Sequence, residues 1–276
     1  MRLRLRTPRA WRRARRTLIG LALAGLGASL MGAPVVGLVL FGSSLLGLIL
    51  LESHQLRRAI QENERQQYAL TQIRPLAGDL PLDFSQWAAD PLMIYNAVRL
   101  VLEARPSLIL ECGSGSSTVI LARCLQGLGR GRIVSLDHDP AFAQRTVEQL
   151  RTRGLESLVT VVIAPLVTRK VGDEVLRWYG PDYEPYLDRP IDLLLVDGPP
   201  GKEAVLARYP AVPLLRQHLS AAGVILLDDG NRSDERTIAQ LWARSLGASL
   251  THVDGGRGGW LLRLPGGDGA SSRLAG

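Results

Sequence analysis

The sequence predicts an α/β fold in which a mostly parallel sheet, flanked by helices, follows an apolar N-terminal segment. Two observations carry this prediction. After Pro75, short apolar runs alternate with amphipathic stretches, which is typical of strands that alternate with helices. Before that point, residues 18–51 contain no charged side chain. At 276 residues the chain has room for one large domain beside this segment.

The apolar run of residues 18–51 is long enough to enter a membrane. One span needs about 20 apolar residues, and this run has 34. The apolar core of a signal peptide has only roughly 7–15 residues, so we expect an uncleaved transmembrane segment. The whole run could form one tilted span. Alternatively, a break at residues 31–34 would divide it into two short helices that form a hairpin. Its glycines would let two helices pack closely, or would serve contacts in an oligomer.

The basic charge of the chain is confined to its N-terminal tail, residues 1–17. Eight arginines lie between Arg2 and Arg16, and the first acidic residue is Glu52. The rest of the chain has 25 basic and 26 acidic residues, so the net charge of +7 belongs to the tail. A domain that binds nucleic acid carries its own basic surface, and we therefore expect no nucleic-acid partner. Arginines beside an apolar segment also place this tail in the cytoplasm.

Three further segments follow the apolar run. Residues 52–74 are polar and rich in Gln, Glu and Arg, which predicts a juxtamembrane helical linker. Residues 75–264 form the main domain, and residues 265–276, rich in Gly and Ser, are expected to be a disordered tail. The two cysteines, Cys112 and Cys124, match neither a zinc pattern nor a disulfide framework, so we expect reduced core residues.

The main domain reads as a succession of strands and helices. Asp90 and Pro91 begin a helix that extends to about Ala104, because Asp caps a helix and Pro fits its first turn. A second helix is expected from about Thr118. Strands are predicted at residues 108–110, 132–136, 159–163, 191–196 and 224–227, with two late strands near 250–253 and at 259–264.

Acidic residues follow four of these strands. Glu111 follows the first strand, Asp137 the second, Asp197 the fourth and Asp228–Asp229 the fifth. In open α/β sheets, ligands bind outside the carboxyl ends of the strands. A single acid at a strand end is commonly a cap, but acids at four strand ends in the same topological position predict one acidic rim of a binding site.

A glycine-rich loop, residues 111–118, follows the first strand. Gly113 and Gly115 let the backbone turn sharply and approach a ligand closely. Dinucleotide sites cradle a pyrophosphate and have a third glycine, whereas this chain has Thr118. The carboxylate of Glu111 would repel a pyrophosphate and suits the cationic sulfonium and amino group of S-adenosylmethionine (SAM). The loop therefore favours SAM, and an NAD-type oxidoreductase or epimerase is the alternative.

These motifs resemble those of a known family. Residues 87–264 are similar to the class I SAM-dependent methyltransferases, and in particular to the catechol-O-methyltransferase-like branch. Residues 111–115 resemble the first motif of that family, and residues 135–140 resemble its second-strand motif. The resemblance implies a Rossmann-like sheet of seven strands, mostly parallel, with an antiparallel last strand.

The resemblance also implies where the cofactor SAM binds. The glycine loop holds the methionine part, Asp137 holds the ribose hydroxyls, and His138 lies near the adenosine. The predicted cofactor-binding residues are Glu111, Gly113, Ser114, Gly115, Thr118, Asp137 and His138.

A divalent cation is doubtful by the same comparison. In metal-dependent members of this branch, an Asp after the fourth strand and an adjacent Asp-Asn pair after the fifth hold magnesium. Asp197 and Asp229 match the two Asp positions, but Gly230 stands at the Asn position. Mg²⁺ needs oxygen ligands in near-ideal octahedral geometry, and Asn231 comes one residue late. If the enzyme uses a metal, its ligands are Asp197, Asp229 and Asn231.

The predicted catalytic residues are Asp197, Asp229 and Lys202. Members of the branch have a lysine base near the fourth-strand acid, and Lys202 lies just beyond the turn of residues 198–201. Alternatively, Lys202 is a solvated residue in the first turn of the next helix. A group of aromatic residues between the third and fourth strands forms an acceptor pocket or lid, or caps the sheet: Trp178, Tyr179, Tyr183 and Tyr186.

These observations predict a membrane-anchored SAM-dependent methyltransferase. We expect O-methyl transfer to a small-molecule, glycan or lipid-linked acceptor. A non-enzymatic membrane scaffold that keeps a degenerate methyltransferase fold is a further alternative. Because SAM is made in the cytoplasm, we expect the catalytic domain on the cytoplasmic face of the inner (plasma) membrane, and this favours the hairpin over the single span.

Overall fold

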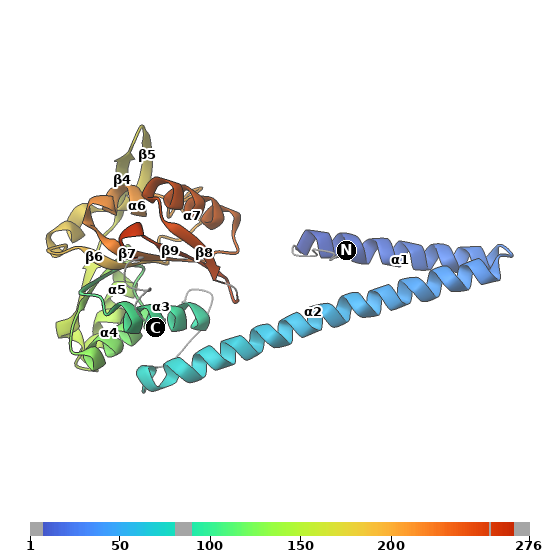
Figure 1. Ribbon diagram of the computed structural model, residues 1–276, viewed down its shortest axis with the longest axis horizontal. Helices are drawn as coiled ribbons and strands as arrows, with labels where there is room; N and C mark the ends of the chain where they lie inside the picture. Colours follow the sequence, from blue (N-terminus) through green and yellow to red (C-terminus); the bar gives the residue numbers. More distant parts are fainter. Residues whose placement is uncertain (1–7, 81–89, 254, 268–276) are drawn as a thin grey trace, which may run out of the picture. The chain divides into compact units, whose positions relative to one another are not determined.

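The computed structural model describes residues 8–80, 90–253 and 255–267 and divides into two compact units, Met1–Glu64 and Arg65–Gly276 (Figure 1). Helix α2 contributes residues to both units. The two units are described separately below. Arg2 and most of the predicted tail of residues 265–276 lie outside the described residues, and Pro265–Gly267 form the short 3-10 helix η4.

The N-terminal unit is a helical hairpin. Helix α1 (Pro8–Leu30) and the first part of α2 (Pro34–Ala77) run antiparallel on either side of a turn at residues 31–33, where the sequence predicted a break (Figure 1). A Cβ atom on Gly37 would lie 2.5 Å from the carbonyl oxygen of Gly25, so only glycine permits this close approach. Near the open end of the hairpin, Arg15 forms an ion pair of 3.3 Å with Glu52.

The hairpin exposes large apolar side chains along both helices. Among the described residues, α2 is the helix that is long and apolar enough, by length and composition, to cross a membrane. The exposed side chains include Leu23, Leu26, Leu30, Val35, Leu38, Val39, Leu46 and Leu50.

The second unit begins within α2, which continues without a break from the apolar run to Ala77. Ala69, Ile73 and Ala77 are buried in this unit, so the end of the helix is part of its core. Helix α3 (Pro91–Ala104) has the predicted boundaries. Its cap is Asp90, whose side chain accepts a hydrogen bond of 2.9 Å from the backbone N–H of Leu92.

A seven-stranded sheet forms the centre of the second unit. Its order is β3-β2-β1-β6-β7-β9-β8; the first five of these strands are parallel, and β9 is antiparallel to both its neighbours. The predicted mostly parallel sheet with an antiparallel last strand is therefore confirmed. The strands are β1 (Leu108–Cys112), β2 (Arg132–Asp137), β3 (Val159–Ile163), β6 (Ile191–Val196), β7 (Leu219–Asp228), β8 (Ser249–Val253) and β9 (Gly259–Arg263).

Helices cover both faces of this sheet (Figure 1). One face packs against α3, α4 (Ser116–Leu128), α5 (Pro140–Arg151) and the end of α2. The other packs against α6 (Ala211–Leu215) and α7 (Ser233–Leu246), with Trp178 and Trp242 fully buried between. The sheet is thus buried on both sides, which explains why its parallel strands are continuous apolar runs.

The connection from β3 to β6 contains a hairpin that the sequence did not predict. Strands β4 (Leu166–Val171) and β5 (Glu174–Tyr179) pair antiparallel as a separate two-stranded sheet and are followed by the 3-10 helix η2 (Pro181–Tyr186). After β6, the expected helix does not begin near Lys202: residues 201–210 form turns before α6. Two other 3-10 helices, η1 (Glu156–Leu158) and η3 (Arg216–His218), precede β3 and β7.

Candidate functional site

A cavity of about 920 Å³ lies at the carboxyl ends of the parallel strands. Loops after β1, β2, β6 and β7 contribute to it, as expected for a ligand site in an open α/β sheet. The lining residues are Gly113–Ser117, Asp137–Asp139, Phe142, Tyr179, Asp197–Gly198, Pro200–Lys202, Ala204, Ala207–Arg208, Asp229, Arg232–Glu235 and Arg257.

The glycine loop forms one wall of the cavity. Gly113 has φ +100°, a backbone conformation that favours glycine, and its N–H donates a hydrogen bond of 2.8 Å to the carbonyl of Leu136 on β2. A Cβ atom at this position would also lie 3.4 Å from the backbone nitrogen of Gly198. The loop then enters α4, so backbone of Gly113, Ser114 and Gly115 faces the cavity.

Glu111 and Thr118 lie beneath this loop, outside the cavity lining. The buried carboxylate of Glu111 accepts hydrogen bonds from three hydroxyls: Ser117 at 2.6 Å, Thr118 at 2.5 Å and Ser135 at 2.7 Å. Burial raises the pKa of Glu111, and the three hydroxyls act in the opposite direction by stabilising the charged form. Glu111 therefore holds the loop through these three hydrogen bonds, and it does not line the cavity.

Asp137 ends β2 and lines the cavity. Its carboxylate accepts hydrogen bonds from the Ser114 hydroxyl at 2.6 Å, the Ser114 N–H at 3.2 Å and the Asp139 N–H at 3.0 Å. His138 also lines the cavity, with its Nδ1 3.7 Å from an oxygen of Asp137. The predicted cofactor residues thus divide into a group at the cavity (Gly113, Ser114, Gly115, Asp137 and His138) and a buried pair below it.

Three carboxylates meet at the ends of β6 and β7. Oxygen atoms of Asp197, Asp228 and Asp229 lie within 4.8 Å of one another. Asp229 has φ +60°, an uncommon conformation for a residue with a side chain. Burial, together with the neighbouring carboxylates of Asp197 and Asp229, raises the pKa of Asp228 well above its ordinary value. Burial also raises the pKa of Asp197, and the Arg208 guanidinium opposes that shift.

Arg208 lies within this cluster, and it was not among the predicted site residues. Its side chain is 3% exposed. The Nη2 atom lies 2.8 Å from a carboxylate oxygen of Asp229 and 3.4 Å from one of Asp197. Further hydrogen bonds reach the backbone carbonyls of Asp197 at 2.7 Å and Asp228 at 3.0 Å. No sequence motif surrounds Arg208. The one indication in the sequence was general: several acids at one edge of a sheet require a nearby cation, but nothing identified which residue supplies it.

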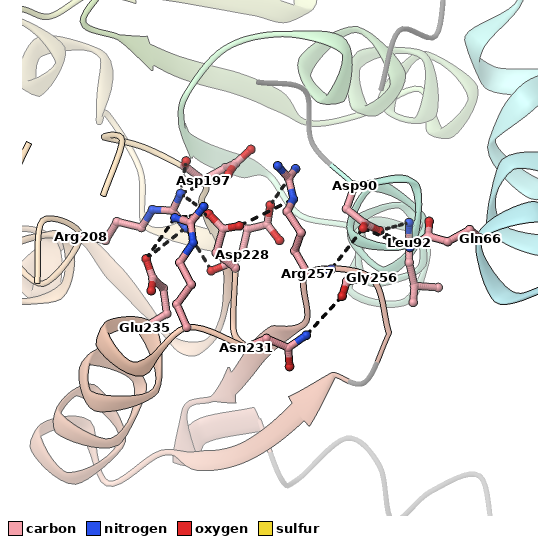
Figure 2. A network of polar contacts seen from close by, with 12 residues as sticks. Gln66, Asp90, Leu92, Asp197, Arg208, Asp228, Asn231, Glu235, Gly256 and Arg257 are labelled. Carbon is pink, nitrogen blue, oxygen red and sulfur yellow. Dashed lines mark hydrogen bonds and ion pairs between the residues drawn. The ribbon is translucent and has the colours of Figure 1, made fainter. Parts of the chain in front are cut away.

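Two more guanidinium groups complete the network in Figure 2. Arg232 lies 2.8 Å from Asp229, and Arg257 lies 3.6 Å from both Asp228 and Asp229. The backbone N–H of Arg257 donates to Asp90, the cap of α3, at 3.2 Å. With Glu235, which lies 3.8 Å from Arg208, four carboxyl groups face three guanidinium groups.

The cluster does not fit the magnesium site of the metal-dependent relatives. Arg208 already lies between Asp197 and Asp229, the two positions that would hold the ion. The amide of Asn231 turns away and donates a hydrogen bond of 3.2 Å to the carbonyl of Gly256 (Figure 2). A Cβ atom at Gly230 would lie 2.7 Å from the backbone of Gly259, so no asparagine fits there. We derive no metal-dependent step for this site.

Two further predicted residues lie at the cavity. Lys202 lines it from the turn after β6, and Tyr179 lines it from the end of β5. The Tyr179 hydroxyl is buried and has no hydrogen-bond partner among the described residues, and burial raises its pKa well above the ordinary value. Trp178 is a core residue. Of the predicted aromatic group, Tyr179 is thus the member that the structure brings to the cavity.

Comparison with known proteins identifies the enzyme class. Residues 110–230 match a family model described as a methyltransferase domain. Together with the seven-stranded sheet, this match confirms the predicted enzyme class, a SAM-dependent methyltransferase. No curated protein matches the chain.

The chain is also similar to several solved structures. The O-methyltransferase TomG from Streptomyces achromogenes, solved with SAM, is 20% identical over 71% of this chain and 88% of its own, with a TM-score of 0.47. A Podospora anserina methyltransferase with S-adenosylhomocysteine is 16% identical over 77% and 95%, with a TM-score of 0.49. A Bacillus cereus O-methyltransferase with S-adenosylhomocysteine is 17% identical over 71% and 90%, with a TM-score of 0.46.

Proposed function

We propose that this chain is a membrane-anchored methyltransferase that transfers a methyl group from SAM to a hydroxyl oxygen of its acceptor. One observation carries the proposal: the glycine loop, Asp137 and Asp197 all line a single cavity at the carboxyl ends of the strands. A cofactor site and a carboxylate that can act on an acceptor therefore share one space.

The cofactor is SAM, which when bound supplies an electrophilic methyl group on a positively charged sulfonium. The residues at the cavity fit such a cation-bearing nucleoside. Asp137 accepts hydrogen bonds from the ribose hydroxyls. Its hydrogen bonds with the N–H and the hydroxyl of Ser114 hold it at a fixed position relative to the loop. His138 lies beside the adenosine. The hydroxyl of Tyr179, which has no hydrogen-bond partner among the described residues, supplies a buried donor at the cavity.

Asp197 is the residue that acts on the acceptor. Its side chain is 25% exposed, whereas those of Asp228 and Asp229 are 1% and 4% exposed. The acceptor oxygen forms a bond to the methyl carbon as the bond between that carbon and the sulfonium sulfur breaks, which leaves S-adenosylhomocysteine. The hydroxyl proton passes to the Asp197 carboxylate, and the cavity walls align the two reactants. Asp229 acts indirectly, by holding Arg208 and Arg232. Lys202, at the cavity lining, contacts the acceptor.

The helical hairpin anchors this enzyme in the membrane. The uncharged part of α1 after Arg16 has 14 residues, a helix of about 21 Å, which is shorter than the roughly 30 Å hydrocarbon core. The hairpin therefore enters and leaves the bilayer on one side. The arginine-rich end of α1 lies on the cytoplasmic side, which puts the catalytic domain on the cytoplasmic face of the inner (plasma) membrane, where SAM is made.

A methyl-transfer assay with the full chain tests this function. The chain in lipid nanodiscs is incubated with methyl-labelled SAM and an extract of its source cells, which is then separated into aqueous, glycan and lipid fractions. We expect label in one fraction, and loss of that label with Asp197→Ala while SAM binding persists. SAM binding without transfer into any fraction would favour the non-enzymatic scaffold.

A further inference from the structure

The Arg208 guanidinium occupies the centre of the carboxylate cluster. Its Nη2 atom is within hydrogen-bond distance of Asp197 and Asp229, the two side chains that match metal ligands in the metal-dependent relatives. Figure 2 shows the guanidinium directed into the cluster from one side and Arg257 from the other. A cation of the protein itself therefore stands between the two acids.

The contacts of Arg208 join the two strands that carry the site. Its fork of N–H donors reaches backbone carbonyls at the ends of β6 and β7 as well as the Asp229 carboxylate. Oxygen atoms from both strand ends thus converge on one positive group, as they would on a bound metal ion. The rigid guanidinium plane suits such a role because it binds several oxygens with fixed geometry.

Besides the three acids, Gly230 and Asn231 offer no side-chain ligand to a metal ion in the part of the chain that the structure describes. Gly230 is held against the backbone of Gly259, with its N–H bonded to the carbonyl of Gly258 at 2.9 Å. The Asn231 side chain is bonded to Gly256. A divalent ion placed among the three acids would also meet the positive charges of Arg208 and Arg257 at short range, and this repulsion weakens its binding.

We propose that Arg208 is the resident cation of this site, that it holds Asp197 and Asp229 in place, and that the chain binds no divalent metal there. The positioning of Asp197 for methyl transfer rests on the proposed function. The exclusion of the metal rests on the contacts of Arg208 and on the chain around the cluster, and it is tested separately.

The test measures binding of Mn²⁺ by electron paramagnetic resonance to the full chain in nanodiscs. We expect no site in the wild-type protein tighter than about 1 mM, a limit typical of weak oxygen-ligand sites. Arg208→Gln leaves the carboxylates without their central cation, so it should bind Mn²⁺ at least about tenfold more tightly, and Mn²⁺ should raise its Tm. Adding Asp229→Asn should remove this gain. Arg232→Gln, which leaves Arg208 in place, is the matched control and should gain no site.

Two results would overturn the inference. One is a wild-type Mn²⁺ site that Asp229→Asn abolishes; the other is a folded Arg208→Gln protein without improved Mn²⁺ binding. If Arg208→Gln does not fold, the wild-type measurement decides the question. Arg208→Lys keeps the charge, so it should then fold, as judged by near-ultraviolet circular dichroism. It should still bind no Mn²⁺ in the electron paramagnetic resonance measurement. SAM calorimetry on the same samples tests the proposed function independently, since absent SAM binding would leave the Mn²⁺ result unchanged.

Discussion

The hydroxyl of Ser114 donates a hydrogen bond of 2.6 Å to the carboxylate of Asp137. The backbone N–H of Ser114 donates to the same oxygen at 3.2 Å. These two bonds join the glycine loop after β1 to the end of β2, so these two parts of the cavity wall keep one geometry. Asp137 therefore supports the loop, and we expect the same carboxylate to bind SAM.

Asp137→Ala should weaken SAM binding by about 10- to 100-fold, because hydrogen bonds to a charged group contribute roughly 1.5–3 kcal/mol and about 1.4 kcal/mol corresponds to a factor of ten. Titration calorimetry of the full chain measures the change in Kd. Asp173→Ala, on the exposed turn of the β4–β5 hairpin, is the matched control and should not change Kd. Equal SAM affinity in wild type and Asp137→Ala would contradict this role.

Glu111→Gln should destabilise the catalytic unit by about 1–3 kcal/mol, since at least one of three buried hydroxyls loses its acceptor. Urea unfolding followed by near-ultraviolet circular dichroism, which reports on the buried Trp178 and Trp242, measures the free energy of unfolding. Glu103→Gln breaks an exposed ion pair with Arg263 and should cost at most about 1 kcal/mol. A similar cost for both variants would show that the Glu111 contacts do not fix the loop.

Gly230→Asn would introduce the asparagine of the metal-dependent relatives, yet we expect loss of stability and no gain of metal binding. A side chain at this position meets the Gly259 backbone at 2.7 Å, and overpacking of this kind costs about 1–3 kcal/mol. Gly247→Asn is the control, because Gly247 has φ +63° and open space around it, which asparagine tolerates. A stable Gly230→Asn protein that binds Mn²⁺ would refute the steric explanation.

The strands of the main sheet could be predicted from the sequence because each is an apolar run bounded by turns, and the sheet buries both its faces. The acids at the carboxyl ends of β1, β2, β6 and β7 followed from the same pattern, since these ends of parallel strands share one edge. The end of α2 was harder to place. Its polar composition indicated a linker, whereas Ile73 packs into the core of the catalytic unit and Ala69 is buried.

The β4–β5 hairpin and Arg208 could not be predicted. The hairpin carries an exposed, mixed pattern over residues 166–176, with no apolar alternation strong enough to indicate a strand. Arg208 lies in a stretch of turns, and its partners come from positions 11 and 21 residues away along the chain. Only the tertiary fold brings them together. The three hydroxyl partners of Glu111 could not be predicted either, and its role in cofactor binding stays a prediction.

Asp228 should make stability depend on pH. Its pKa in the folded protein is raised well above 3.8 by burial, so the folded state keeps a proton that the unfolded chain releases. The proton on Asp228 therefore adds a stabilising contribution to the free energy of unfolding. This contribution is fully present below the unfolded pKa of 3.8 and is lost as pH rises through the folded pKa. Asp228→Asn removes this titration, so its stability relative to wild type should increase between about pH 5 and about pH 8. Urea unfolding at both pH values measures this, and a constant difference would contradict the raised pKa.

Titration calorimetry of SAM into the full chain in nanodiscs tests the central claim most directly. We predict saturable binding at one site per chain, unchanged by EDTA and strongly weakened by Asp137→Ala. No heat with either SAM or S-adenosylhomocysteine, from a sample whose near-ultraviolet circular dichroism shows it to be folded, would contradict the account.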